Sequence, residues 1–243
     1  MSDFAPTLSL CAPAYNEEAG IERVVRDWEE TLGQIAVAAE IVITDDGSTD
    51  GTAEILRRLQ GEFANLVVVD QKPNAGYGRA VAAAIAHSRG QQVMTLDSDG
   101  QFDPGEYPRL LEQMERGYDI VTGYRRRKND KPARVVADRG LNLLVRLLFG
   151  LPLRDTNCAL KLMRGDAARL IAIEARGFPT PTEILVKANA LGYRICEVGI
   201  THHPRLAGES KLKVVRTGWD FLLFLFYLRF KVMLYHRRVI TAL

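Results

Sequence analysis

The sequence has few cysteines and almost no net charge, and each scarcity excludes a class of protein. Its three cysteines, Cys11, Cys158 and Cys196, lie far apart and lack metal-ligand spacing. They therefore predict reduced thiols in a cytoplasmic protein rather than a disulfide framework. The chain has 32 Lys and Arg against 30 Asp and Glu. The resulting charge of +2 gives no argument for nucleic-acid binding, so no nucleic-acid partner is expected.

Long apolar runs and sorting signals are also absent. No stretch of about 18 uncharged apolar residues occurs, so the sequence predicts no ordinary transmembrane helix. The segment Phe4–Cys11 is too short and too polar at its start for a signal peptide. No internal repeat or low-complexity segment is visible. With 47% hydrophobic and 26% charged residues, the 243-residue chain is expected to form one large domain or two small ones.

Short apolar runs alternate with helical patterns five times in the first half of the chain. A helix beginning near Glu17 is expected to be capped by Asn16. The alternation predicts an α/β fold, in which helices flank a mostly parallel sheet. The predicted strands are Thr7–Ala12, Glu40–Thr44, Leu66–Val69, Gln92–Leu96 and Tyr118–Thr122.

The pattern changes after Tyr124, where a basic loop over Arg125–Arg134 is expected. Beyond this loop the sequence predicts helices over Leu141–Phe149 and Asp166–Glu174, a helix capped by Thr182 and ending near Leu191, and strands over Ala159–Met163 and Tyr193–Val198.

Polar residues that suit a ligand site follow the first, second and fourth predicted strands. After the fourth strand, Asp97 and Asp99 are separated by one residue, and Gln101 follows. Two neighbouring carboxylates repel each other, and a hard cation such as Mg²⁺ or Mn²⁺ relieves that repulsion. The triplet alone also fits a polar turn. Because ligands of open α/β sheets bind at the carboxyl ends of strands, the coincidence at three strand ends favours the metal site.

Four motifs in fixed order resemble those of the inverting family 2 glycosyltransferases with the GT-A fold, which is a Rossmann-like arrangement. They are Pro13-Ala14-Tyr15-Asn16-Glu17, Asp45-Asp46-Gly47-Ser48-Thr49-Asp50-Gly51-Thr52, Asp97-Ser98-Asp99-Gly100-Gln101 and Arg205-Leu206-Ala207-Gly208-Glu209-Ser210-Lys211. Three further segments are similar to the branch that includes dolichol-phosphate mannose synthase and bacterial polyprenyl-phosphate sugar transferases: Arg139-Gly140-Leu141-Asn142, Asp155-Thr156-Asn157-Cys158 and Glu183-Ile184-Leu185-Val186-Lys187. The resemblance covers about Leu8 to Val215.

The resemblance implies a role for each matching residue. Asp97 and Asp99, with Ser98 and Gln101 beside them, would hold Mg²⁺ or Mn²⁺ on the donor diphosphate. Arg125 and Arg139 would bind the acceptor phosphate at the catalytic centre. The nucleotide base and ribose would be lined by Pro13, Tyr15, Glu17, Thr44 and Asp46, and the donor phosphates neutralised by Arg205 and Lys211, whereas Lys161 stands where relatives often have Arg.

Each of these residues also has a purely structural interpretation. Asp46 fits a helix cap, and Arg205 and Lys211 fit solvated surface charges. His202 and His203 precede Pro204 in a predicted loop, where surface histidines are commoner than ligands. The order of the four motifs favours the functional interpretation for the motif residues. It says nothing about the two histidines.

The resemblance implies metal-dependent, inverting transfer of a hexose, mannose or glucose, from GDP-mannose or UDP-glucose to polyprenyl or dolichyl phosphate. A lipid phosphate is already anionic and needs positioning more than a general base. A sugar hydroxyl as acceptor would need a carboxylate base, and none can be singled out. Three alternatives stay open: transfer to a soluble or glycan hydroxyl, a non-catalytic nucleotide-sugar-binding subunit, and a nucleotidyltransferase. Against the last of these, this chain lacks the Gly-rich, basic signature that nucleotidyltransferases normally have near the first strand.

The last 31 residues, 213–243, form a predicted helical tail behind a catalytic domain of residues 1–212. Lys213, Arg216, Asp220 and Lys231 would share one face with Tyr227 and Arg238, and the rest is broadly apolar. The helix is expected either to pack as core or to lie at a membrane interface, where Trp219, Phe221, Leu222, Leu225 and Phe226 insert.

Several relatives carry transmembrane helices after the catalytic domain, whereas this chain ends at Leu243. The expected location is peripheral, on the cytoplasmic face of a membrane, which the chain reaches through its tail. The absence of predicted transmembrane helices would also be explained by a membrane partner subunit, by a homo-oligomer or by a soluble acceptor.

Overall fold

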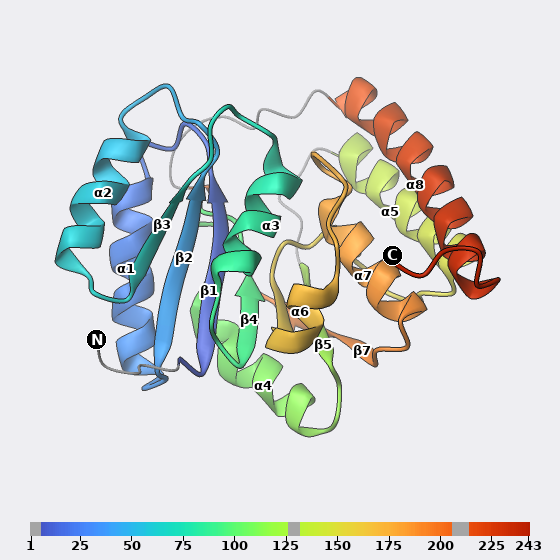
Figure 1. The fold of residues 1–243 in the computed structure, drawn as a ribbon, viewed down its shortest axis with the longest axis horizontal. Helices are drawn as coiled ribbons and strands as arrows, with labels where there is room; N and C mark the ends of the chain where they lie inside the picture. Colours follow the sequence, from blue (N-terminus) through green and yellow to red (C-terminus); the bar gives the residue numbers. More distant parts are fainter. Residues whose placement is uncertain (1–5, 126–131, 206–213) are drawn as a thin grey trace.

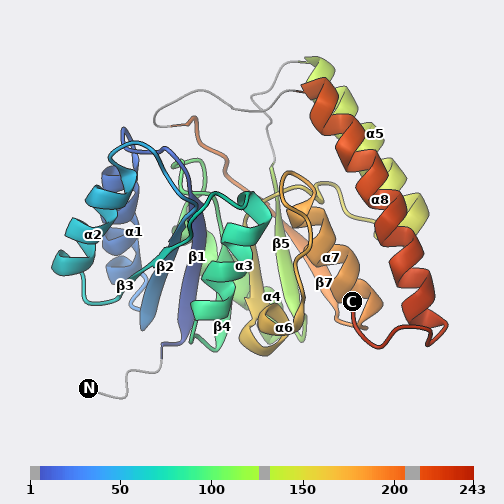
Figure 2. The same cartoon turned by 45° about the horizontal axis from the view of Figure 1, so that its top comes forward.

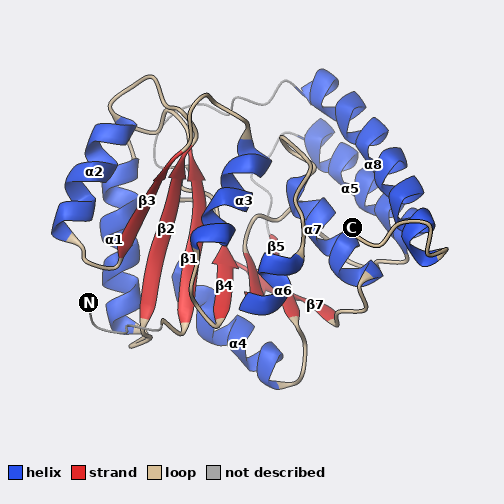
Figure 3. Ribbon diagram, viewed as in Figure 1, coloured by secondary structure: helices blue, strands red, loops and turns tan. Residues whose placement is uncertain are grey.

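The computed structural model describes residues 6–125, 132–205 and 214–243. Within them a seven-stranded sheet lies between two layers of helices (Figures 1 and 3). The strands are β1 (Leu8–Ala14), β2 (Ala39–Asp45), β3 (Leu66–Asp70), β4 (Gln92–Thr95), β5 (Ile120–Arg125), β6 (Lys161–Arg164) and β7 (Ile195–Ile200). The helices are α1 (Ile21–Gln34), α2 (Thr52–Glu62), α3 (Tyr77–His87), α4 (Tyr107–Glu115), α5 (Pro132–Phe149), α6 (Gly165–Leu170), α7 (Thr180–Ala190), α8 (Val214–His236) and the 3-10 helix η1 (Pro104–Glu106).

The strand order is β3-β2-β1-β4-β6-β5-β7. The strands β1, β2, β3 and β4 pair in parallel, and β5 pairs in parallel with β7. Only β6 among the described strands runs antiparallel to its neighbours β4 and β5. The predicted mostly parallel α/β sheet is therefore confirmed, and the carboxyl ends of β1, β2 and β4 meet at one edge.

Successive side chains of the central strands enter two different cores, because side chains alternate between the faces of a sheet. Leu10 and Ile41 belong to the core under α1, α2 and α4. Cys11 and Val42 belong to the core under α3, α7 and α8. Near-continuous apolar strands are typical of a sheet that is covered on both faces.

Several predicted element boundaries are wrong. Asn16 does not cap a helix from Glu17, because α1 begins at Ile21 and Asn16 has φ of +53° in a turn. Thr182 lies inside α7, which begins at Thr180, and its hydroxyl donates to Asn157 Oδ1. The helix predicted over Asp166–Glu174 ends at Leu170. Local capping patterns failed at these places because long-range hydrogen bonds decide the conformation.

The tail helix packs along α5 in both views of the molecule (Figures 1 and 2). Phe221, Leu225, Leu228 and Val232 of α8 are buried in the second core. The prediction that Phe221 and Leu225 insert into a membrane is therefore wrong. The side facing away from this core carries Trp219, Leu223, Phe226 and Phe230, each more than half exposed. One helix thus combines a core face with an apolar solvent face. The division into domains at residue 212 stays a prediction.

Candidate active site

A cavity of about 1010 Å³ opens at the carboxyl ends of β1, β2 and β4. Of the residues singled out in the sequence, it is lined by Pro13, Tyr15, Glu17, Asp46, Asp97, Ser98, Asp99, Gln101, Arg125 and Arg205. Thr44 and Lys161 are completely buried and do not line the cavity. Arg139 is exposed on α5 outside the cavity lining. Lys211, like Lys213, lies outside the described residues.

The first two motifs are held together by a ladder of side chain to backbone hydrogen bonds. Thr49 N donates to Asn16 Oδ1 at 2.8 Å, and Glu17 N donates to Thr52 Oγ1 at 2.8 Å. Ser98 Oγ of the third motif donates to Pro13 O at 2.7 Å. These contacts span strands that are distant in sequence. They fix the loops after β1, β2 and β4 as one wall of the cavity.

The carboxylate of Asp46 accepts several hydrogen bonds from other residues of the chain. Its Oδ1 accepts hydrogen bonds from Gln71 Nε2 at 2.6 Å and Ala75 N at 2.8 Å, and its Oδ2 accepts one from Gly76 N at 2.9 Å. The carboxylate thus anchors the segment between β3 and α3. It lines the cavity at the same time, so its predicted contact with the nucleotide would be added to this anchoring role.

Asp97 and Asp99 lie one residue apart in the cavity lining and form an acidic pair. Burial and, second, the charge of Asp99 raise the pKa of Asp97 to about 7, although the Tyr77 hydroxyl, Arg205 and Arg125 act in the opposite direction. Tyr77 Oη donates to Asp97 Oδ1 at 2.9 Å. Asp99 Oδ1 accepts from Gln101 N at 3.0 Å. A divalent cation suits such a pair, because its charge would offset the burial and the repulsion that raise the pKa of Asp97.

Arg205 bridges two acidic residues of the cavity wall. Its Nη2 lies 2.8 Å from Asp99 Oδ2, and its Nη1 lies 3.4 Å from Glu17 Oε1. The guanidinium therefore reaches the acidic pair from a segment about 100 residues further along the chain. Its position suits neutralisation of the diphosphate that a cation on Asp99 would hold.

The donor set fits a hard cation bound together with a substrate. Oxygen ligands from Asp97, Asp99 and the Gln101 side chain match Mg²⁺ or Mn²⁺. Within the described ranges no group of three or more His, Cys, Asp and Glu forms a self-sufficient metal site. Two carboxylates leave coordination positions for phosphate oxygens and water, as Mg²⁺ sites with phosphate substrates commonly do.

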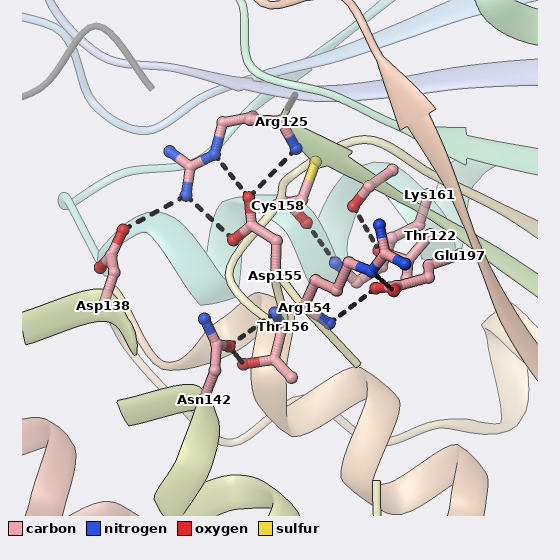
Figure 4. Close-up of polar contacts among 11 residues, drawn as sticks. Thr122, Arg125, Asp138, Asn142, Arg154, Asp155, Thr156, Cys158, Lys161 and Glu197 are labelled. Carbon is pink, nitrogen blue, oxygen red and sulfur yellow. Dashed lines mark hydrogen bonds and ion pairs between the residues drawn. The ribbon is translucent and has the colours of Figure 1, made fainter. Parts of the chain in front are cut away.

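Arg125 is fixed in place by two carboxylates (Figure 4). Its Nε lies 2.7 Å from Asp155 Oδ2 and its Nη2 lies 3.0 Å from Asp155 Oδ1, so the contact is bidentate. Asp138 of α5 adds a contact at 3.6 Å. Asn142 of α5 accepts hydrogen bonds from Thr156 N and Oγ1. The helix α5 thereby sets the position of the loop that orients Arg125.

Lys161 stands behind the cavity wall rather than in it. Its ammonium group donates to the backbone oxygen of Cys158 (Figure 4). Burial lowers the pKa of Lys161 to about 8, and the nearby charges of Asp155 and Asp97 partly oppose this shift. A buried cation at this position supports the loop of Asp155 and is too remote from the cavity surface to contact a substrate directly.

The structure adds cavity residues that sequence reasoning missed. His202 lines the cavity, with its ring 5.2 Å from that of Phe102 in an edge-to-face contact. Tyr77 also lines the cavity, whereas the sequence indicated only that it lies at the start of a helix. The segment 171–179 was expected to be partly helical and instead forms a wall with Ala175, Arg176, Gly177, Phe178 and Pro179, and α8 adds Asp220 and Phe224.

A family model described as glycosyl transferase family 2 matches residues 9–168. The undecaprenyl-phosphate 4-deoxy-4-formamido-L-arabinose transferase of Pseudomonas aeruginosa is 35% identical over 211 residues, which are 86% of this chain and 61% of the relative. A protein of the same name from Edwardsiella ictaluri is 33% identical over 227 residues, covering 90% of this chain and 69% of the relative. This chain therefore spans about three fifths of the length of the first of these relatives.

The fold is also similar to that of solved structures. Glucosyl-3-phosphoglycerate synthase from Mycobacterium tuberculosis, in complex with phosphoglyceric acid, superposes with a TM-score of 0.70 at 21% identity, covering 92% of this chain and 80% of that one. Its complex with Mn²⁺, UDP-glucose and phosphoglyceric acid gives 0.69 at 22% identity, with the same coverage. At such identities the likeness bears on the fold, and it confirms the expected GT-A type of sheet.

Proposed function

This chain belongs to glycosyl transferase family 2, and on that premise we propose that it transfers a sugar from a nucleotide sugar to a polyprenyl phosphate. The single observation that carries the proposal is the cavity in which Asp97, Asp99, Arg125 and Arg205 converge from four segments of the chain. The names of the relatives, which specify undecaprenyl phosphate, support the lipid acceptor.

We assign the donor half of the cavity to the nucleotide diphosphate. A divalent cation supplies charge stabilisation for the leaving diphosphate when it is held there by Asp97, Asp99 and Gln101. The Mn²⁺ complex of the mycobacterial synthase supports a metal of this kind. Arg205 is placed to share that charge after exchanging its contact with Asp99 for phosphate oxygens. Tyr77 keeps the Asp97 carboxylate oriented toward the site.

We assign Arg125 to the acceptor phosphate. Because Asp155 and Asp138 hold its guanidinium, Arg125 is oriented before a substrate arrives. The phosphate oxygen then attacks the anomeric carbon on the face opposite the leaving diphosphate, the C–O bond to the diphosphate breaks, and the configuration inverts. No proton has to be removed from such a nucleophile. The role predicted for Arg139, on the outer side of α5, stays a prediction.

The sugar itself is open to direct test. The sequence resemblance predicts a hexose from GDP-mannose or UDP-glucose, whereas the names of the relatives give 4-deoxy-4-formamido-L-arabinose. Labelled donors of all three sugars should be incubated with and without a polyprenyl phosphate and Mn²⁺. We expect lipid-linked product with one donor only and release of the nucleoside diphosphate in equal amount. Turnover only with a hydroxyl acceptor would replace the proposed acceptor, and binding without turnover would indicate a non-catalytic subunit.

We further propose that the enzyme reaches its acceptor by lying on the membrane surface. Six exposed apolar side chains lie on the packed helices α5 and α8, and we call them the α5–α8 apolar face: Leu143, Leu147, Trp219, Leu223, Phe226 and Phe230. Arg139, Arg146 and Arg229 are exposed on the same two helices and can meet anionic headgroups at about 1 kcal/mol each. No helix in the described part of the chain is long and apolar enough to cross a membrane. Interfacial contact matches this combination of apolar surface and flanking cations.

The α5–α8 apolar face can be tested without disturbing the core. Combined replacement of Trp219, Phe226 and Phe230 by Ser should abolish co-sedimentation with anionic liposomes, whereas the native chain should pellet and be released by salt. Leu170→Ser, an exposed position on α6, is the matched control. A native chain that stays in solution and is dimeric or larger by light scattering would assign this face to a subunit interface instead.

A further inference from the structure

Arg176 is a cavity residue to which the motifs assign no role. It lies in the segment 171–179 between α6 and α7, which is gold in Figure 2 and passes beside the start of α3. Its side chain is exposed. The other two arginines in the described lining are engaged, Arg125 with Asp155 and Arg205 with Asp99. Among the described residues no ion pair or hydrogen bond engages the Arg176 guanidinium, so its donors are available to a ligand.

The backbone of Arg176 is fixed on the side of α3. Gly78 N donates to Arg176 O at 3.3 Å. A Cβ at Gly76 would lie 2.4 Å from Arg176 O, and one at Gly78 would lie 1.8 Å from Ala175 O. Only glycines allow this approach, and Gly76 also has φ of +97°. The approach places Arg176 next to the helix start whose Tyr77 contacts Asp97, the residue to which we assign the cation.

A partly buried ionic cluster fixes the same segment from α7 and α8. Glu183 of α7 accepts hydrogen bonds from Glu174 N at 3.0 Å and Ala175 N at 2.8 Å. The Glu174 carboxylate in turn lies 2.8 Å from Lys187 Nζ and 2.7 Å from Lys231 Nζ of α8. The segment is therefore held within two residues of Arg176. The backbone that carries Arg176 is thus ordered before a ligand binds, and only the side chain has still to be ordered on binding.

The surroundings of Arg176 combine one cation with apolar surface. Phe178 and Pro179 follow Arg176 closely in the cavity lining, to which Phe224 of α8 also belongs, and the Phe178 ring lies 5.8 Å from that of Phe221 of α8. A phosphate attached to a hydrocarbon chain matches both features, because its oxygens suit the guanidinium fork and its chain suits the rings.

We propose that Arg176 binds the acceptor phosphate, while Phe178 and Phe224 contact the first units of the prenyl chain. This inference rests on the proposed function and adds a residue to its acceptor half. Arg176 and Arg125 would then hold the acceptor phosphate together, with the donor diphosphate on the side of Asp99 and Arg205.

The test distinguishes binding of the acceptor phosphate by Arg176 from binding of the donor diphosphate. The KM for a short, water-soluble prenyl phosphate and the Kd for the nucleoside diphosphate with Mn²⁺ should be measured for Arg176→Gln and Arg176→Lys. Loss of a charge-assisted contact worth about 1.5–3 kcal/mol predicts a rise in KM of about 10- to 100-fold for Arg176→Gln, with the Kd unchanged. Arg176→Lys should recover part of the loss, since it keeps the charge without the fork. Arg116→Gln, at the exposed residue that follows α4, is the control.

Each other result overturns the assignment. A matching rise in the nucleotide Kd would place Arg176 on the donor diphosphate, and unchanged constants would make it a solvated surface charge. If the native enzyme transfers no sugar to prenyl phosphate, the proposed function fails on its own. Direct binding of the prenyl phosphate by the native chain and by Arg176→Gln then decides the inference separately: equal affinities would overturn it.

Discussion

Replacing Asp99 with Ala is expected to reduce sugar transfer by at least about 100- to 1,000-fold, since charge stabilisation by a metal contributes several kcal/mol to the transition state. Asp99 is buried, and its oxygens face Arg205 and the backbone of Gln101. Removal of the carboxylate deprives the cation of one ligand and leaves Asp97 as the remaining carboxylate. EDTA should inactivate the native enzyme to a similar degree.

A second measurement distinguishes loss of the metal from loss of the Arg205 contact. Mn²⁺ should tighten the binding of the nucleoside diphosphate to the native chain and leave it unchanged in Asp99→Asn, which keeps the shape of the side chain. Asp70→Asn, at the end of β3 in an exposed pair with Arg57, is the control and should retain full activity. Full transfer by the native enzyme in EDTA would contradict the metal assignment.

The residues that we assign to the donor could be predicted from the sequence, because a short stretch of residues is enough to recognise the end of a strand. Apolar runs ending in Asp45-Asp46 and in Asp97-Ser98-Asp99 mark the ends of buried strands, and parallel pairing brings those ends to one edge. The motif order then selected the residues to which we assign a function. Arg205 was placed by resemblance alone, and the structure brings it within 2.8 Å of Asp99.

Apart from Arg125, the part of the cavity that we assign to the acceptor could not be predicted, because long-range contacts build it. Arg176 follows an unremarkable helix signal, and its backbone is placed by glycines about 100 residues earlier in the chain. The sequence predicts Asn16 as a helix cap, yet its side-chain oxygen accepts a hydrogen bond from Thr49 N in the loop after β2. Thr182 looked like a cap and instead hydrogen-bonds the loop before β6. Asn16 and Thr182 are short polar side chains that hydrogen-bond to residues distant in the sequence, and no local pattern encodes those partners.

Lys187→Met is expected to destabilise the fold by about 3–5 kcal/mol, the usual cost of removing one partner of a buried ion pair. Lys187 and Glu183 are both completely buried, and their Nζ and Oε1 atoms lie 2.8 Å apart. Methionine preserves most of the volume, so the loss measures charge rather than packing. The free energy of unfolding in urea is the appropriate readout, with Arg116→Met as the control. Arg116 and Glu112 form an exposed pair, whose loss should cost at most about 1 kcal/mol.

A double variant shows where the loss originates. In Lys187→Met the Glu183 carboxylate stays buried with backbone donors from Glu174 and Ala175 but without a cation. Adding Glu183→Gln removes that charge and keeps an oxygen acceptor for those donors, so it should restore part of the stability. A double variant less stable than Lys187→Met would instead show that the carboxylate is stabilised by its backbone donors alone. The segment leading to Arg176 would then be fixed by those two hydrogen bonds and by the glycines of α3, without help from the lysine.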